Sequence, residues 1–174
     1  MSYLHKTVNL GLLFGGSDGD LIGYCDANSA GDLGNRRSTS RAVFTLHDGP
    51  IFWFSRRQSC VAFSNTEPKI SAAEAAKQAI WLNRILVELG IPELPVPLRC
   101  DNQGAIALYD PVFHQKTKHI DVRFFFSKDA QAEKKIDVSY IETESQLADI
   151  FTKALPAPRF EKLRSSLNIC ETEN

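Results

Sequence analysis

Two short apolar segments of this chain each end directly on an aspartate. Residues 21–25 run into Asp26, and residues 96–100 run into Asp101. Apolar runs of this length are typical of buried β-strands, and neighbouring strands of a sheet lie about 4.8 Å apart. If these two strands are neighbours, both carboxylates lie at one edge of the sheet, which constrains the fold and the chemistry together.

A carboxylate after a strand also has a purely structural use. Aspartate readily caps the turn or helix that follows it, so a single aspartate in such a place says little about function. Two like charges at adjacent strand ends are costly unless a cation neutralises them, which favours a metal site. A third carboxylate, Asp149, either joins this cluster or complements the dipole of its own helix. Three converging carboxylates favour hard cations such as Mg²⁺, a pair of which can drive phosphodiester hydrolysis.

The rest of the pattern predicts one α/β domain. Its 174 residues, 43% of them hydrophobic and 24% charged, fit a single globular unit and exclude collagen-like, coiled-coil and wholly disordered chains. Strands are predicted at 42–46, 51–55 and 136–141, and helices at about 67–89, 121–133, 145–155 and 158–167, with a short helix after Asp101. Early strands followed by mixed strands and helices indicate a mixed sheet covered by helices.

Charge, cysteines and hydropathy narrow the class of protein further. The net charge of −1 excludes a general electrostatic attraction of the whole chain to a polyanion. Any nucleic-acid contact therefore depends on local basic clusters. The alternative is that these clusters only form a solvated surface. These clusters are Arg36, Arg37 and Arg41; Arg56 and Arg57; and Lys116, Lys118 and Arg123. The four cysteines lie far apart and are interpreted as reduced thiols. The absence of a long apolar stretch predicts no membrane partner and an intracellular protein, cytoplasmic or nuclear.

The aromatic side chains are assigned to packing rather than to binding. Trp53, Trp81 and the run of phenylalanines at 124–126 are predicted to lie in the core, because large aromatic residues are usually buried there. The alternative for the phenylalanine run is a surface on which nucleic-acid bases stack.

Several separate motifs, in the right order, resemble the ribonuclease H domain of copia-type retrotransposon Pol polyproteins. They are Gly-Tyr-Cys-Asp at 23–26, Ala-Gly-Asp at 30–32, Asn-Arg-Arg-Ser-Thr-Ser at 35–40, Cys-Asp-Asn-Gln at 100–103, Thr-Lys-His-Ile-Asp-Val-Arg at 117–123 and Gln-Leu-Ala-Asp-Ile-Phe-Thr-Lys at 146–153. The resemblance covers about residues 20–167. Residues 1–19 are interpreted as a remnant of the preceding reverse transcriptase region, and 168–174 as a polar tail of a terminal polyprotein fragment.

The resemblance implies a fold, a reaction and a set of site residues. The implied fold is a ribonuclease H-like five-stranded mixed sheet, three strands antiparallel and two parallel, flanked by helices. The implied reaction is hydrolysis of the RNA strand of an RNA/DNA hybrid during reverse transcription, with two Mg²⁺ ions, or Mn²⁺, held by three aspartates and a glutamate. The aspartates carry over to Asp26, Asp101 and Asp149. The implied partners are the hybrid, contacted by Arg36, Arg37, Arg56, Arg57, Lys118 and Arg123, and the reverse transcriptase region.

Two positions depart from the family pattern near the expected site. The metal-binding glutamate is replaced by Lys69, which removes a negative charge and adds a positive one. Glu67 is a candidate surrogate, although two residues along a helix correspond to a rotation of about 200°. Arg41 stands where the family has glycine. The alternative function is therefore a catalytically dead nucleic-acid-binding domain, or a transposon relic, with the same fold.

Overall fold

The computed structural model describes residues 7–15, 19–28, 38–58, 67–92, 94–109, 122–151 and 153–172. Among the predicted nucleic-acid contacts, Arg36, Arg37 and Lys118 lie outside these residues. Glu67 and Arg123 are described by their backbone alone.

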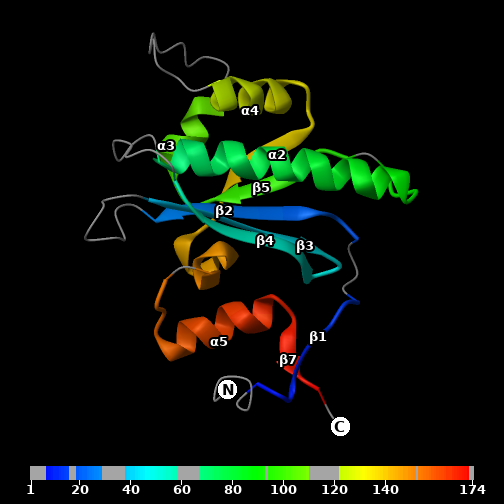
Figure 1. Cartoon of the computed structure of the whole chain (residues 1–174), viewed down its shortest axis with the longest axis vertical. Coiled ribbons are helices and arrows are strands. Elements are labelled where there is room, and N and C mark those ends of the chain that lie inside the picture. Colours follow the sequence, from blue (N-terminus) through cyan, green and yellow to red (C-terminus); the bar gives the residue numbers. More distant parts are fainter. Residues whose placement is uncertain are drawn as a thin grey trace.

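A five-stranded mixed sheet forms the centre of the domain (Figure 1). Its strands lie in the order β4-β3-β2-β5-β6, with β2, β3 and β4 antiparallel and with β5 parallel to both β2 and β6. Their bounds are Ile22–Asn28 for β2, Thr39–Leu46 for β3, Gly49–Arg57 for β4, Val96–Cys100 for β5 and Ile136–Tyr140 for β6. The predicted fold class, with three antiparallel strands and two parallel ones, is confirmed.

The predicted hairpin is formed by β3 and β4. Its two turn residues, His47 and Asp48, have φ angles of 49° and 62°. A two-residue turn with both φ angles positive matches the right-handed twist of the strands that it joins. Both strands extend further than the sequence predicts, because pairing continues from the turn to Thr39 opposite Arg57.

Helix α2 (Glu67–Glu88) lies along one face of the sheet (Figure 1). It turns a stripe of fully buried alanines toward the strands, and these small side chains let the helix approach the sheet closely. The stripe consists of Ala72, Ala75, Ala76 and Ala79. The helix ends where predicted, because Gly90 adopts a φ of 87° and the amide of Ile91 donates back to the carbonyl of Leu86 at 2.9 Å.

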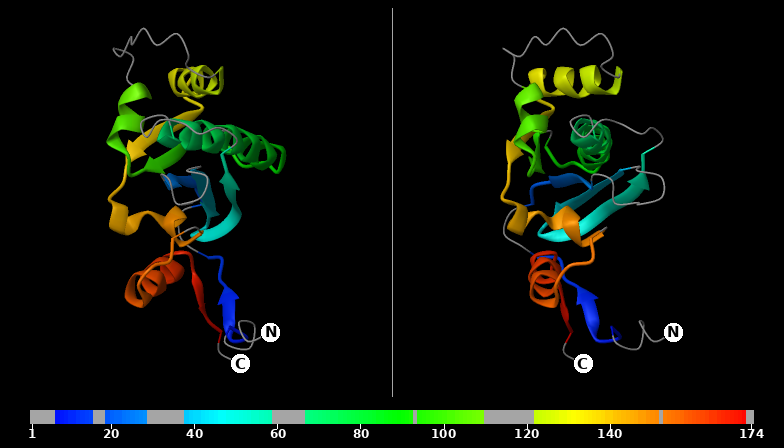
Figure 2. Two further views of the ribbon diagram at one scale, coloured as in Figure 1. Left: turned by 60° about the vertical axis from the view of Figure 1, so that its left-hand side comes forward. Right: turned by 90° about the vertical axis from the view of Figure 1, so that its left-hand side faces the viewer.

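The remaining helices cover both faces of the sheet. Helix α4 (Val122–Ala132) lies on the outer side of α2, whereas α5 (Ala157–Ser166) lies beyond the opposite face (Figures 1 and 2). The short α3 (Gln103–Ile106) and the 3₁₀ turn η1 (Ala107–Tyr109) follow β5. Residues 103–106 and 122–132 thus form helices close to where the sequence predicts them.

The predicted helix at 145–155 is wrong. The structure has two 3₁₀ turns there, η2 (Thr143–Ser145) and η3 (Leu147–Phe151). They are separated by Gln146, whose backbone is extended with φ −74° and ψ 99°. An extended residue cannot continue a helix, so the segment folds as two short turns.

A second, two-stranded sheet joins segments from opposite ends of the sequence. Strand β1 (Leu10–Leu12) pairs antiparallel with β7 (Ile169–Glu171). The prediction of a polar tail at 168–174 did not include this strand. The boundaries proposed at residues 19 and 167 stay a prediction, although β1 and β7 both fall outside them.

Strand β3 is buried on both faces and divides the core in two. Ala42 and Phe44 face α2 and belong to one apolar cluster, whereas Val43 faces η3 and α5 and belongs to the other. This follows from the alternation of side chains along a strand. A side chain at position 41 therefore points to the same side as Val43, beneath η3.

Four aromatic residues that the sequence assigned to the core are exposed. Trp53 and Trp81 are 56% and 51% exposed, and Phe125 and Phe126 are 53% and 42% exposed. The predicted core position is wrong for all four. Trp53 lies on the edge strand β4, Trp81 lies on an exposed side of α2, and the two phenylalanines lie on α4, which packs mainly on α2. No helix among the described residues has the length and apolar character needed to span a membrane.

Candidate functional site

The aspartates predicted from the strand ends lie at one edge of the sheet. Strands β2 and β5 are parallel neighbours with Cys25 opposite Cys100, so Asp26 and Asp101 are the next residues on adjacent strands. Asp101 follows the end of β5, whereas β2 continues past Asp26 to Asn28. Turn η3 brings Asp149 to the same edge, where its side chain is fully buried. Among the described residues, however, no three acidic, cysteine or histidine side chains are arranged so that they could hold a metal ion.

The buried side chain of Gln146 attaches η3 to the sheet. Its amide nitrogen donates to the carbonyl of Cys25 at 3.1 Å and to that of Arg99 at 3.4 Å. Its side-chain oxygen accepts from the amide of Ala148 at 3.2 Å. Gln146 therefore connects the middle of β2 and the end of β5 to the turn that carries Asp149.

Arg41 occupies the space between the carboxylates. It lies directly opposite Asp26 in the β2–β3 register, and its fully buried guanidinium pairs with Asp26 Oδ2. The same guanidinium nitrogen lies 3.2 Å from Asp149 Oδ1. Two further nitrogens of Arg41, Nε and Nη1, are buried without a hydrogen-bond partner among the described atoms. Arg41 thus bridges the two most buried carboxylates of the site.

Two more cations reach the same carboxylates from the C-terminal part of the chain. Lys153 Nζ lies 3.2 Å from Asp26 Oδ2 and 2.7 Å from Asp149 Oδ1. Arg159, on α5, lies 2.7 Å from Asp149 Oδ2. Because the other oxygen of Asp26 accepts the amide of Ala27 at 2.6 Å, each carboxylate oxygen of Asp26 and Asp149 already has a donor.

The carboxyl pKa values reflect burial and this shared charge. Burial raises the pKa of Asp101, and the nearby carboxylates of Asp26 and Asp149 raise it further. Burial also raises the pKa of Asp149, against the opposing effect of the hydrogen bond from Lys153. For Asp26 burial again favours the neutral form, but Arg41 and Lys153 outweigh it and hold its pKa below the ordinary value.

The first turn of α2 packs directly behind Asp26. The hydroxyl of Ser71 donates to the backbone carbonyl of Asp26 at 2.6 Å. Lys69 lies two residues earlier on the helix and is partly buried. The backbone of Glu67 begins the same helix, two residues before Lys69.

Comparisons with known proteins place this architecture. The chain is 42% identical over 163 residues to the retrovirus-related Pol polyprotein from transposon TNT 1-94 of Nicotiana tabacum. It is 35% identical over 173 residues to the one from transposon RE1 of Arabidopsis thaliana. These matches include 92% and 97% of the chain but only 12% of each polyprotein. No protein-family model matches the chain.

Solved structures show the same fold at low sequence identity. LC11-RNase H1 in complex with an RNA/DNA hybrid matches with a TM-score of 0.56 and 15% identity, over 73% of this chain and 88% of that one. RNase H1 from Halobacterium salinarum matches with a TM-score of 0.52 and 15% identity, over 75% of this chain and 91% of that one. The chain is a retrotransposon Pol homologue with the ribonuclease H fold. The resemblance to ribonuclease H domains of retrotransposon Pol polyproteins is confirmed.

The carboxylates of this Pol ribonuclease H domain do not fit a pair of Mg²⁺ ions. Mg²⁺ requires near-octahedral oxygen coordination at about 2.0–2.1 Å. Here the oxygens of Asp26 and Asp149 bind cationic side chains, and the buried guanidinium of Arg41 fills the space between them. Two nitrogens of Arg41 that have no hydrogen-bond partner among the described residues add donors, not ligands, to the site. Lys69 further replaces the expected anionic ligand with a cation.

Only part of the predicted nucleic-acid contact set is described. Arg56 and Arg57 are exposed near the end of β4, where alternation along the strand places them on opposite faces of the sheet. Arg57 shares the face of Arg41, whereas Arg56 lies on the face of α2, with its guanidinium 5.5 Å from the ring centre of Phe54.

Sequence reasoning did not identify Gln146, Lys153 and Arg159 as residues of the site. Lys153 follows Asp149 by four residues, a spacing that allows an ion pair on one face of a helix and offered a usable signal. Gln146 lay inside a recognised motif but without an assigned role. Nothing in the sequence pattern connects Arg159 to Asp149.

Proposed function

We propose that this Pol ribonuclease H domain binds RNA/DNA hybrids without hydrolysing the RNA strand. The observation that carries the proposal is the buried guanidinium of Arg41, which bridges Asp26 and Asp149. These are the carboxylates that the family resemblance assigns to the metal ions. Binding without cleavage is therefore the function that fits the residues of this chain best.

Displacing Arg41 from the site is energetically unfavourable. A metal ion bound between Asp26 and Asp149 would force the guanidinium out of its place, and that guanidinium has no exposed surface. Removing one partner of a buried ion pair costs about 3–5 kcal/mol, because the remaining charge stays buried and unpaired. A divalent ion must overcome this cost before it gains any coordination energy.

Lys69 acts in the same direction. An ammonium group at the position of a metal-binding carboxylate repels a divalent cation and supplies no ligand. Glu67 begins the helix two residues earlier, and a small misplacement of a catalytic group is enough to lose most of its effect. We therefore assign neither Glu67 nor Lys69 a catalytic role.

Support for hybrid binding comes from the fold and from exposed basic residues. LC11-RNase H1, which shares the fold, was solved in complex with an RNA/DNA hybrid. Arg57 is exposed on the sheet face that carries Arg41, so it can contact a phosphate backbone laid across the carboxylate edge. We further propose that the domain works beside the reverse transcriptase region of a Pol polyprotein, inside the cell.

One set of samples tests both parts of this proposal. Fluorescence anisotropy measures the affinity of the chain for a labelled RNA/DNA hybrid and for DNA and RNA duplexes of the same sequence. Denaturing gels of the same mixtures, with Mg²⁺ or Mn²⁺ added, reveal any cut RNA. We expect a preference for the hybrid, intact RNA, and weaker binding after Arg57→Gln.

Two results contradict the proposal. Equal affinity for all three duplexes rules out hybrid recognition. Cleavage by the wild-type chain that disappears in Asp101→Asn establishes a metal-dependent nuclease and rules out the inactive site. The Asp101→Asn variant also separates activity of this chain from that of a contaminating nuclease.

A further inference from the structure

The exposed side of α2 carries a row of cationic and aromatic side chains remote from the carboxylates. Lys77, Trp81 and Arg84 are spaced by four and three residues, so they lie on one face of the helix. Lys77 and Arg84 are exposed, and neither forms an ion pair with any described residue. Trp81 lies twelve residues beyond Lys69, a rise of about 18 Å along the helix axis.

Two hollows meet along this row. One lies between α2 and α4, has a volume of about 370 Å³, and is bordered by Lys77, Trp81, Arg84 and Phe126. The other lies between α2 and β4, has a volume of about 220 Å³, and is bordered by Arg56 and again by Lys77. Lys77 thus borders both hollows. The first hollow also has Lys135, in the turn after α4, and the second has Arg56, on β4.

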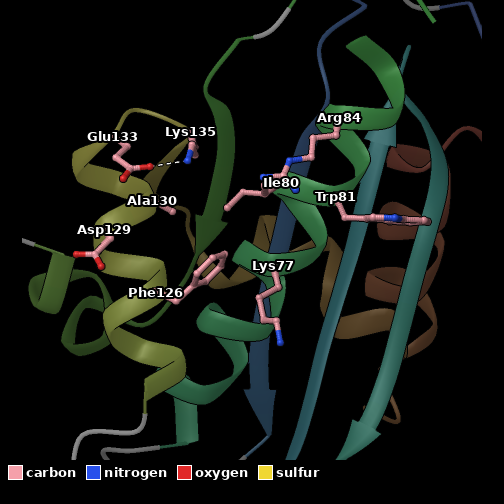
Figure 3. A pocket seen from close by; sticks show the side chains of 9 residues that line it. All are labelled: Lys77, Ile80, Trp81, Arg84, Phe126, Asp129, Ala130, Glu133 and Lys135. Carbon is pink, nitrogen blue, oxygen red and sulfur yellow. Dashed lines mark ion pairs between the residues drawn. The ribbon is translucent and has the colours of Figure 1, made fainter. Parts of the chain in front are cut away.

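Aromatic surfaces flank the helix on both sides (Figure 3). Trp81 extends toward β4, where its ring meets Phe52 with the ring centres 6.0 Å apart, and about half of Trp81 stays exposed. Phe126 extends from α4 toward α2 on the other side. Exposed aromatic rings held by packed neighbours are surfaces on which flat ligands can stack.

The charges around the row favour an anionic ligand. Glu133 is neutralised by its ion pair with Lys135 at 2.5 Å. The carboxylate of Asp129 points away from α2 (Figure 3). Glu74 contributes one negative charge to the second hollow, where Arg56 and Lys77 outnumber it. Arg56, Lys77 and Arg84 remain as cations without an ion-pair partner among the described residues.

We propose that Lys77, Trp81 and Arg84, with Arg56 and Phe126 at the sides, form a binding surface for single-stranded nucleic acid, separate from the carboxylate edge. Cationic side chains contact the phosphates, and the exposed rings stack on bases. An unpaired strand fits this surface better than a duplex does, because paired bases do not present their faces to a protein ring. This surface would act in addition to the proposed hybrid binding. Its own binding of a single strand does not require that the domain binds a hybrid.

The fluorescence of Trp81 reports directly on this surface. The chain has two tryptophans, so Trp53→Phe leaves Trp81 as the only one. A short oligo(dT) is titrated into this variant, and quenching of the remaining fluorescence gives the affinity. We expect saturable quenching and a loss of affinity of about tenfold or more when Lys77→Gln and Arg84→Gln are introduced together. Lys162→Gln, at an exposed position of α5, is the matched control and leaves the affinity unchanged.

Three outcomes overturn the proposal. They are the absence of quenching, an unchanged affinity in the Lys77→Gln and Arg84→Gln variant, and equal quenching by poly-glutamate, which indicates a general anion or acidic-peptide surface. The changed residues are exposed, so each variant is expected to fold, and thermal melting checks this. Failure of hybrid binding leaves this readout intact, because oligo(dT) forms no hybrid and Trp81 lies far from the carboxylates.

Discussion

Arg41 and Asp26 lie opposite each other on β3 and β2, and their ion pair is closed off from solvent. The register of the two strands fixes both residues on the same face of the sheet, beneath η3. A long cationic side chain at position 41 can therefore reach Asp149 as well, at 3.2 Å. This one position changes an acidic edge into a buried network of ion pairs.

Arg41→Gly is expected to destabilise the domain. It leaves Asp26 and Asp149 buried with one cation fewer, which lowers the free energy of unfolding by about 3 kcal/mol. Urea denaturation followed by circular dichroism measures the change. The matched control is Arg56→Gly, the same substitution at an exposed position of β4, with an expected cost of about 1 kcal/mol. Equal costs at the two positions would show that the Arg41 network contributes no stability.

Mn²⁺ is expected to change the melting temperature of a variant with a more acidic site but not that of the wild-type chain. In the wild-type chain, Mn²⁺ leaves the melting temperature unchanged, because Arg41 holds the carboxylates. With Arg41→Gly and Lys69→Glu introduced together, Mn²⁺ binds the folded state and raises the melting temperature. The free energy of unfolding then rises by about 2.7 kcal/mol when the ion is present at a hundred times its Kd. Adding Asp149→Asn to this pair should abolish the gain, and a Mn²⁺ response in the wild type would contradict the proposed inactive site.

Asp101→Asn is expected to stabilise the domain at neutral pH. The pKa of Asp101 is raised by burial and by two neighbouring carboxylates, so its ionised form costs stability in the folded state. That cost is present well above the raised folded pKa and disappears as the pH falls through it and Asp101 takes up a proton. The melting temperature of the variant should therefore exceed that of the wild type at about pH 7, with a difference that shrinks toward about pH 4. A difference that grows on acidification would contradict the raised pKa.

Gln146→Leu is expected to loosen η3. The substitution keeps a buried side chain of similar size but leaves the carbonyls of Cys25 and Arg99 without their donor. Unsatisfied buried polar groups cost about 1–3 kcal/mol, which denaturation measures. Gln103→Leu, at an exposed position of α3, serves as the control and should cost far less. A negligible loss in Gln146→Leu would mean that the apolar contacts of η3 and the ion pairs of Asp149 hold the turn without Gln146.

Local patterns in the sequence predicted individual strands and a mixed sheet, whereas the five-stranded sheet was implied by the family resemblance. The apolar runs before Asp26 and Asp101 predicted two strands, which the structure shows to be neighbours, and the turn residues at 47–50 predicted the β3–β4 hairpin. Each of these features depends on residues close together in the chain or on a simple alternation. The helix at 145–155 was predicted wrongly because Gln146 bonds to strands more than forty residues away.

The chemistry of the edge depends on long-range contacts that no local pattern reveals. Arg41 was recognised as an unusual residue, but its effect depends on which face of β3 packs beneath η3. The exposure of Trp81 likewise depends on tertiary packing: its ring meets Phe52 of β4 and stays about half exposed, whereas its residue type alone predicts burial. Side-chain reach and layer order had to be seen in three dimensions.

Among the described residues, three cations lie close to the three aspartates of the carboxylate edge. Asp26, Asp101 and Asp149 are matched by Arg41, Lys153 and Arg159. A cluster without net charge neither attracts nor repels a distant polyanion strongly, because the fields of its members largely cancel. An approaching nucleic acid is therefore oriented by basic side chains elsewhere on the surface, and its position on the domain is decided before it touches the carboxylates.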